Sequence, residues 1–272
     1  MPNIPLQKKT GMPLIGLGTW KLNGKECEQV LHTALELGYR HIDTADTYQN
    51  HLAIGQVIKS CPQREQLFLT TKLSIDSLLP HQVEAAVPRF LEDLHVNYLD
   101  LLLIHWPNPN VSLDQTLLAM QAFQKQGIVR KIGVSNFVRS HFECLASYRF
   151  PIAVNQIEMH PYLQRRPLVH YCRQHEISLT AYRPLAKGAF EQNEILKAIG
   201  AKYKKTASQV ALNWLVQQDI VVIPKAASAK HLKDNLALFD FELSAEDRQQ
   251  IAQLESGRRF CNPADLPVCE DE

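Results

Sequence analysis

Eight apolar runs recur along the whole chain, and several of them are continuously hydrophobic rather than alternating. Residues 101–104 and 221–223, for example, contain no polar side chain. Strands buried on both faces show this pattern, because helices cover both sides of a parallel sheet. The eight predicted strands are residues 13–20, 39–45, 67–73, 98–107, 129–137, 151–159, 177–185 and 220–226.

Helical patterns fill the gaps between these runs. In residues 26–37, Val30, Leu31 and Ala34 share one face, and Gly38 suits the position directly after a helix. The gap before the eighth run is unusually long and has room for two helices instead of one. The additional helices are predicted over residues 191–203 and 207–217, and a further one begins at Ser244.

Eight strand–helix units predict an α/β protein whose parallel sheet closes into a (β/α)8 TIM barrel. We expect one domain over residues 1–272, with a short N-terminal hairpin that turns at Thr10 and Gly11, and with two extra helices. A doubly wound sheet is the alternative. It usually carries a GxGxxG phosphate-binding loop after the first strand, whereas here Gly16 and Gly18 lack the third glycine. The residues after Gly257 are predicted to form a surface loop.

Composition narrows the class of protein. Lys and Arg number 29 against 28 Asp and Glu, and this balance argues against nucleic acid as a partner. The six cysteines form no CxxC pair, which indicates reduced thiols and a cytoplasmic location. The first residues contain no apolar signal region, and the most apolar stretch, residues 98–107, is too short to span a membrane. We expect a monomer.

Polar and aromatic side chains stand where nearly every predicted strand ends. In a TIM barrel these carboxyl ends surround the active site, so the residues should converge on one mouth. A single Asp at a strand end is usually a helix cap and a single His is usually a packed core residue, but the whole set favours a functional site. The converging residues are Thr19, Trp20, Asp43, Tyr48, Lys72, His105, Trp106, Ser135, Asn136, Gln156, Tyr182 and Lys225.

These residue types favour proton transfer over metal or serine chemistry. No HExxH-type spacing predicts a metal site, and no GxSxG turn predicts a nucleophilic serine. A tyrosine beside a lysine is an acid whose pKa, ordinarily near ~10, is pulled down by the positive charge. Such a tyrosine donates a proton to the oxygen of a carbonyl as it is reduced, and a neutral histidine hydrogen-bonds the same oxygen.

The same segments resemble the aldo-keto reductase family over essentially the whole chain. Within that family, the resemblance is closest to short bacterial 2,5-diketo-gluconate reductases and methylglyoxal reductases. The matching segments are GLGTW at residues 16–20, GYRHIDTADTY at 38–48, TK at 71–72, DLLLIHWP at 100–107, GVSNF at 133–137, NQIEMHPY at 155–162 and IPK at 223–225.

The resemblance implies reduction of small aldehydes and ketones to alcohols by hydride transfer from NADPH, with NADH as a second cofactor. Tyr48 would be the general acid, Lys72 paired with Asp43 would lower its pKa, and His105 would orient the carbonyl. Trp20, Tyr48, His105 and Trp106 would line the substrate pocket. The implied cofactor-binding residues are Thr19, Trp20, Asp43, Ser135, Asn136, Gln156, Tyr182, Leu185, Lys225, Ser228, His231 and Asn235.

Two departures from the family pattern concern the cofactor. His231 stands where an arginine would grip the 2′-phosphate, so we expect NADPH to be preferred over NADH by a modest margin only. Arg183 stands where the family usually has a serine, so we expect the part of the site that faces the pyrophosphate of the cofactor to differ from that of other family members.

Two rival functions fit the same fold. Some proteins with this fold act as ion-channel subunits, but the intact Asp43, Tyr48, Lys72 and His105 argue for catalysis. A lyase or isomerase would use Lys72 as a Schiff base. That role requires a lowered lysine pKa, whereas pairing with Asp43 would raise it.

Overall fold

The computed structural model describes residues 4–61 and 64–261. It contains one eight-stranded parallel sheet whose strands follow one another in sequence order. This order excludes the doubly wound alternative, which requires the strand order to reverse. The strands are β1 Leu17–Gly18, β2 His41–Asp43, β3 Phe68–Leu73, β4 Leu99–Ile104, β5 Val129–Ser135, β6 Ile152–Glu158, β7 Ser178–Tyr182 and β8 Val221–Val222.

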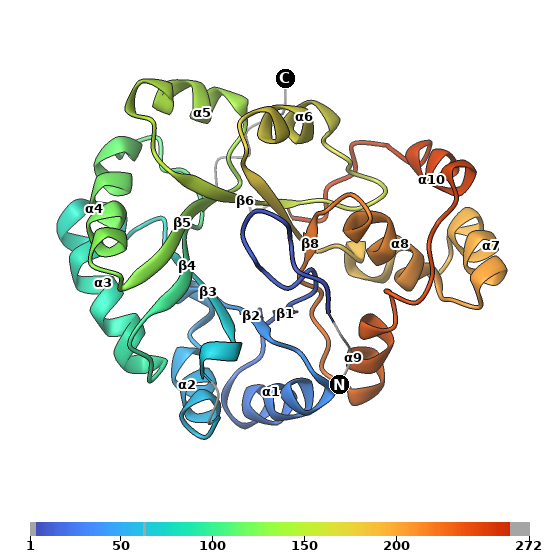
Figure 1. Ribbon diagram of the computed structural model, residues 1–272, viewed down its shortest axis with the longest axis horizontal. Helices are drawn as coiled ribbons and strands as arrows, with labels where there is room; N and C mark the ends of the chain where they lie inside the picture. The colour runs from blue at the N-terminus through green and yellow to red at the C-terminus, as the bar shows by residue number, and fades with distance from the viewer. Residues whose placement is uncertain (1–3, 62–63, 262–272) are drawn as a thin grey trace.

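The sheet closes on itself between its first and last strands (Figure 1). Ile15 forms a parallel bridge to Val222, and the backbone of Gly16 donates to the Val222 carbonyl at 2.8 Å. The predicted (β/α)8 barrel is therefore confirmed. β1 and β8 are shorter than predicted, because only two residues of each belong to the regular ladder and the seam between them is formed by the single Ile15–Val222 bridge.

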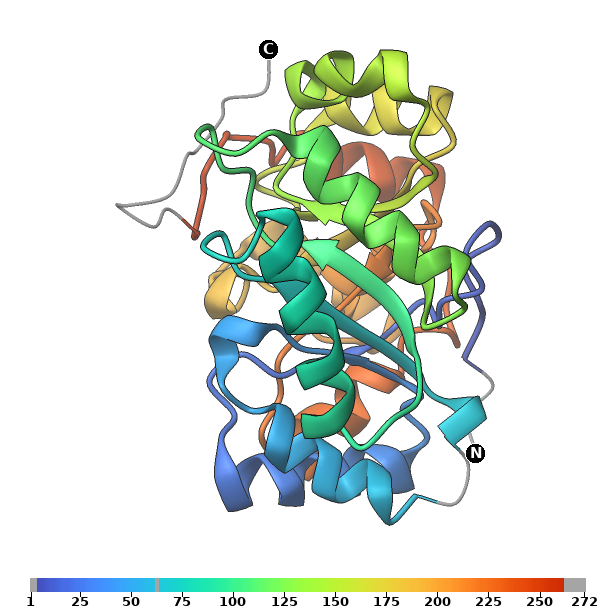
Figure 2. The same ribbon diagram turned by 90° about the vertical axis from the view of Figure 1, so that its left-hand side faces the viewer.

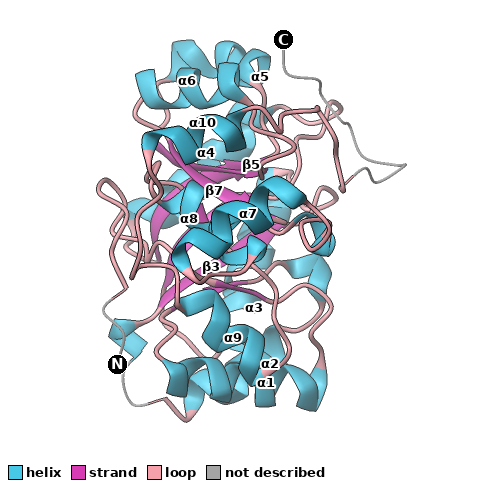
Figure 3. Cartoon of the chain, turned by 90° about the vertical axis from the view of Figure 1, so that its right-hand side faces the viewer, coloured by secondary structure: helices cyan, strands magenta, loops and turns pink. Residues whose placement is uncertain are grey.

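Ten α-helices in the described residues surround the sheet. In Figure 2 the teal and green helices α3 and α4 cover the outside of the strands beside them, and Figure 3 shows α7 next to α8. The helices are α1 Gly24–Leu37, α2 His51–Lys59, α3 Pro80–Asp93, α4 Leu113–Lys125, α5 Arg139–Leu145, α6 Arg166–Gln174, α7 Glu194–Tyr203, α8 Ala207–Val216, α9 Ala229–Leu236 and α10 Ala245–Ala252.

The sequence signals explain why these elements form where they do. Gly38 ends α1 in the left-handed conformation at φ 106°, as its position predicted. The Thr206 side chain caps α8 by accepting from the Gln209 backbone. The N-terminal hairpin is present, with a bridge between Leu6 and Pro13. The continuously apolar strands are buried, and β4 is buried throughout.

The structure also bears on the predictions about the cysteines and about membrane-spanning segments. The described cysteines Cys27, Cys61, Cys144, Cys172 and Cys261 are free thiols, and Cys269 lies outside the described residues. Among the helices of residues 4–61 and 64–261, none is long and apolar enough to cross a membrane.

Candidate active site

Four polar side chains from neighbouring elements meet at the carboxyl end of the barrel. Asp43 ends β2, Lys72 lies in β3, His105 directly follows β4, and Tyr48 ends the short 3-10 helix η1 (Asp46–Tyr48). Lys72 Nζ lies 2.5 Å from Asp43 Oδ1 and donates to the Thr44 carbonyl at 2.8 Å. The Tyr48 ring centroid lies 5.1 Å from Lys72 Nζ and 5.7 Å from the centroid of the His105 ring.

The ion pair beneath Tyr48 is fully buried. Lys72 is 0 % exposed and Asp43 is 1 % exposed, and Gln156 Nε2 donates to the second carboxylate oxygen of Asp43 at 2.7 Å. Burial is the largest single effect on the pKa of Lys72 and would lower it, but the charges and hydrogen bonds of Asp43 and Tyr48 together outweigh burial and raise the pKa. Lys72 therefore stays protonated, which disfavours the Schiff-base alternative.

Tyr48 is half-buried, and two opposing effects act on its phenol. Burial raises its pKa, and the charge of Lys72 opposes that rise. Burial is the larger effect, so the pKa lies above its ordinary value and the expected net lowering is wrong. The consequence for proton donation is favourable, because a phenol with a raised pKa is protonated at neutral pH and has a proton to give.

His105 faces Tyr48 and is neutral. Burial and the nearby charge of Lys72 lower its pKa to about 3. Asn136 Nδ2 donates to the His105 carbonyl at 3.0 Å and so ties the residue to β5. A neutral imidazole can donate one hydrogen bond to a carbonyl oxygen without competing with Tyr48 as an acid.

A cavity of about 550 Å³ opens above these four residues. Lys72 lies in the buried layer below it, and Leu185, Ser228, His231 and Asn235 do not line it. The remaining predicted site residues all line it: Thr19, Trp20, Asp43, Tyr48, His105, Trp106, Ser135, Asn136, Gln156, Tyr182 and Lys225.

The wall formed by β5, β6 and β7 is a connected row of amides and hydroxyls. Ser135 Oγ donates to the Gln156 carbonyl at 2.8 Å, and Tyr182 OH donates to Asn136 Oδ1 at 2.8 Å. Asn136 has φ 62°, a left-handed conformation that asparagine tolerates better than most residues. These bonds hold the ring of Tyr182 and the polar edges of Ser135 and Asn136 in fixed positions along the cavity.

The residues predicted to meet the far end of a dinucleotide lie around α9. Lys225 is exposed and borders the cavity. Ser228 Oγ accepts from the His231 backbone at 3.2 Å and caps α9, while the His231 side chain is exposed. Asn235 is 5 % exposed and hydrogen-bonds the buried Tyr39, so its side chain has a structural partner already.

Sequence reasoning missed two lining residues at the end of the described segment 64–261. Phe260 and Cys261 belong to the segment that was expected to be a surface loop, yet both line the cavity. Glu158, at the end of β6, accepts from their backbone nitrogens at 2.6 and 2.9 Å and fastens the segment over the mouth. No apolar periodicity marks this segment, so only the tertiary contact identifies it.

Arg183, the departure noted in the sequence, also lies in the mouth. Its guanidinium carbon is 5.0 Å from the centroid of the Trp20 ring, and Nη1 donates to the Phe260 carbonyl. Trp20 is 43 % exposed, and Lys21 Nζ lies 4.7 Å from the ring centroid. Cations therefore surround the indole that closes one side of the cavity.

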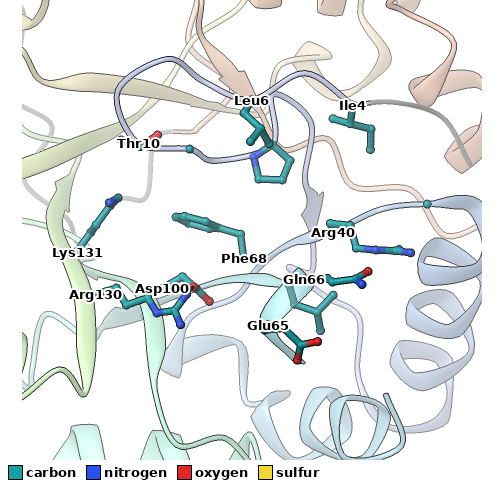
Figure 4. A pocket seen from close by; sticks show the side chains of 14 residues that line it. Ile4, Leu6, Thr10, Arg40, Glu65, Gln66, Phe68, Asp100, Arg130 and Lys131 are labelled. Carbon is teal, nitrogen blue, oxygen red and sulfur yellow. Dashed lines mark hydrogen bonds and ion pairs between the residues drawn. The ribbon is translucent and has the colours of Figure 1, made fainter. Parts of the chain in front are cut away.

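The opposite end of the barrel holds a cavity of about 470 Å³ beneath the N-terminal hairpin, with Phe68 and Leu6 facing it (Figure 4). Its buried carboxylate is already paired, because Asp100 binds Arg64 at 2.8 Å and Arg130 at 3.2 Å. Barrel residues at this end usually serve stability. Within the described ranges, no three His, Cys, Asp or Glu side chains are placed to hold a metal ion at either end.

Comparison with known proteins agrees with this geometry. The chain is 39 % identical to methylglyoxal reductase DkgB of Escherichia coli O157:H7, over 94 % of this chain and 97 % of that one. It superposes with a TM-score of 0.93 and 38 % identity on a protein provisionally assigned as 2,5-diketo-D-gluconic acid reductase B, covering 100 % and 98 % of the two chains. A crystal structure of an aldo-keto reductase complexed with NADPH gives a TM-score of 0.91 at 33 % identity, covering 97 % and 91 %.

The family model for the aldo/keto reductases matches residues 14–256, which span the barrel from before β1 to beyond α10. The similarity thus includes the strands that carry the four polar residues as well as the walls of the cavity. The chain belongs to the aldo/keto reductase family.

Proposed function

We propose that the protein reduces small aldehydes and ketones to alcohols, with NADPH as the preferred cofactor and Tyr48 as the general acid. The observation that carries the proposal is the buried Lys72–Asp43 pair directly beneath a protonated Tyr48, with neutral His105 facing the same cavity. The relatives named as reductases of methylglyoxal and diketo-gluconate support small carbonyl substrates.

The cavity wall fits a nicotinamide cofactor. Ser135, Asn136 and Gln156 present polar atoms at one edge of the cavity, and the Tyr182 ring offers a flat face beside them. These groups suit a planar aromatic ring that carries a carboxamide. When bound, the cofactor supplies a hydride to the carbonyl carbon.

The chain's own residues then handle the carbonyl oxygen. His105 donates a hydrogen bond that positions this oxygen, and Tyr48 gives its phenolic proton to the oxygen as negative charge develops there. The positive charge of Lys72 stabilises the phenolate that remains, and Asp43 holds Lys72 in place through the 2.5 Å contact. Trp20 and Trp106 exclude water from two sides of the cavity.

Every residue in this scheme comes from one chain, so the proposed reaction requires only a monomer. Lys225 and the amino end of α9 would meet the adenosine phosphates, because backbone N–H groups and a fixed cation both attract phosphate. Exposed His231 gives a weaker grip than an arginine would, which keeps the proposed preference for NADPH modest.

The test is Tyr48→Phe, measured as the single-turnover rate of methylglyoxal reduction and as NADPH affinity by fluorescence titration. We expect the rate to fall by about 10²–10⁴-fold, the usual contribution of general acid catalysis, while cofactor affinity stays close to wild type. Tyr148→Phe changes an exposed tyrosine outside the cavity and serves as the matched control. A Tyr48→Phe enzyme that keeps more than half of the rate would show that another group donates the proton.

A further inference from the structure

A further charged cavity lies outside the barrel, between α6, α8 and α10. It has a volume of about 400 Å³, and these three helices are neighbours in the outer ring at the upper right of Figure 1. Figure 3 shows α6 and α10 next to each other on this side of the molecule. None of the residues that line the catalytic cavity also lines this one.

Helix α6 contributes a cationic edge to this cavity. Arg166, His170 and Arg173 are spaced four and three residues apart, which puts their side chains on the same face of the helix. Arg248 from α10 lies across the cavity from them in the fold. Three arginines from two helices that are far apart in the sequence therefore line one cavity.

No carboxylate in the described part of the chain forms an ion pair with these arginines. The described residues that line the cavity include no Asp or Glu, and Arg166, Arg173 and Arg248 form no ion pair with any described residue. Two acids on the adjoining segments, Asp247 and Glu255, have other partners. Asp247 binds Lys202, Tyr203 and Ser244, and the Glu255 carboxylate accepts from the backbone of Gln164 and Gly257.

The arginines are nevertheless held in place by neutral acceptors. Arg166 Nη2 donates to the Ala252 carbonyl at 2.6 Å, and Arg173 Nη2 donates to the Gln218 carbonyl at 3.2 Å. Arg248 Nη1 donates to the Leu243 carbonyl at 2.8 Å. Each guanidinium has five N–H donors, so these bonds fix its position and leave donors directed elsewhere.

The floor of the cavity is apolar and well packed. Trp214 is 5 % exposed, Val169 is 6 % exposed and Met159 is 1 % exposed, and all three line the cavity. A ligand on this floor is shielded from water on one side, which strengthens its attraction to the arginines at the rim. Guanidinium groups recognise phosphate oxygens through paired hydrogen bonds, so phosphate is the group that this rim suits.

We propose that the cavity between α6, α8 and α10 is a binding site for a small phosphorylated molecule, separate from the catalytic cavity. The arginine rim binds the phosphate, and the apolar floor of Trp214 and Val169 contacts the organic part of the ligand. A purely structural role, in which the arginines only bind helix carbonyls, predicts no such binding and is the alternative that the experiment must distinguish.

Trp214 provides a local probe for the test. The chain has three tryptophans, and the other two, Trp20 and Trp106, lie in the catalytic cavity. In a Trp20→Phe, Trp106→Phe background, all tryptophan fluorescence comes from Trp214 in the cavity between α6, α8 and α10. Titration with pyrophosphate should change this fluorescence until it reaches a plateau. Glucose 6-phosphate should also produce a saturating change, whereas glucose should produce none.

The arginines are then changed one at a time in this background. Arg173→Gln and Arg248→Gln keep a side-chain donor for the carbonyl but remove the charge, and each should weaken pyrophosphate binding by about tenfold or more. Arg149→Gln removes an exposed arginine outside the cavity and should change the affinity less than twofold. Urea unfolding midpoints establish that each variant is folded, and the two cavity variants are independent tests.

Three results would overturn the proposal. The first is a fluorescence response to pyrophosphate that never saturates, and the second is an equal response to glucose and glucose 6-phosphate. The third is an equal loss of affinity in Arg149→Gln and Arg173→Gln, which would indicate a general effect of net charge. Because the assay does not involve carbonyl reduction, its outcome is independent of the proposed catalytic function.

Discussion

Replacing Lys72 by methionine separates the proposed catalytic role of this lysine from its structural role. Methionine fills much of the space of the lysine stem but removes the charge and the donors. Asp43, 1 % exposed, would keep only the hydrogen bond from Gln156 at 2.7 Å, and the Thr44 carbonyl would lose its donor at 2.8 Å. The variant therefore contains a buried carboxylate without its counter-charge.

The expected loss of stability follows from that unpaired charge. Removing one partner of a buried ion pair costs about 3–5 kcal/mol. For a chain of this size, each kcal/mol lowers Tm by roughly 2–4 °C, so we expect Lys72→Met to unfold about 6–20 °C below wild type. Thermal unfolding followed by circular dichroism measures this directly. A Tm within 2 °C of wild type would contradict the argument from burial.

Activity should fall for a different reason. Without Lys72, nothing opposes the burial that raises the pKa of Tyr48, and no positive charge stabilises the phenolate. The single-turnover rate of carbonyl reduction should therefore drop, and the loss of rate at alkaline pH should move to higher pH. A purely structural role of Lys72 would leave that pH dependence unchanged.

The double variant Asp43→Asn, Lys72→Met distinguishes the two effects. It removes both charges, so most of the lost stability should return, since two neutral groups cost less to bury than one unpaired ion. Activity should not return, because the positive charge near Tyr48 is still missing. If the double variant regains the wild-type rate, Lys72 does not act through its charge on Tyr48.

Three further perturbations test other parts of the structure. Burial lowers the pKa of three histidines, to about 4 for His41 and His51 and about 3 for His105. In the unfolded chain these histidines bind protons below pH ~6.5, whereas in the folded chain they stay neutral. Acidification below that pH should therefore destabilise the fold by up to about 1.4 kcal/mol per pH unit for each residue. A urea midpoint that does not decrease when the pH is lowered from 7.5 to 5 would contradict this. Arg183→Ser removes the cation over Trp20 and should increase acrylamide quenching of tryptophan fluorescence. Unchanged quenching would show that the Arg183 guanidinium does not cover Trp20 when the protein is in solution. His231→Arg should tighten NADPH binding by about 1–2 kcal/mol and leave NADH unchanged in fluorescence titrations, whereas equal effects on both cofactors would exclude contact with the 2′-phosphate.

The barrel and the position of the candidate site residues could be predicted because strand ends have a fixed place in this fold. Once eight buried strands are recognised, the residues after them must face one another, and Asp43 and His105 are found from their position alone. The direction of the Tyr48 pKa could not be found in this way. The direction depends on whether burial of the phenol, which raises the pKa, outweighs the charge of Lys72, which lowers it. Neither the burial nor the distance to Lys72 can be obtained from the sequence.

The end of the described chain shows a second limit. Phe260 and Cys261 have no periodic pattern, and their place over the mouth depends on Glu158, about a hundred residues earlier. Glu158 itself lies inside a matching family segment and gives no sign of its partner. Contacts between an irregular segment and a strand end are decided by tertiary geometry, so sequence periodicity predicted a surface loop there.

The proposed catalytic site and the cavity between α6, α8 and α10 place basic side chains in opposite electrostatic settings. At the proposed catalytic site, the charge of Lys72 is balanced by Asp43 at 2.5 Å, an arrangement that suits the proposed binding of a neutral carbonyl and stabilisation of a phenolate. Between α6, α8 and α10, the charges of Arg173 and Arg248 have no carboxylate partner among the described residues, so the gain on binding an anion is not offset by breaking an existing pair. The first arrangement favours proton transfer, and the second favours retention of an anionic ligand. A chain with a net charge of only +1 can contain both kinds of site. Over such short distances, electrostatic interactions depend on where the individual charges lie and not on the net charge of the chain.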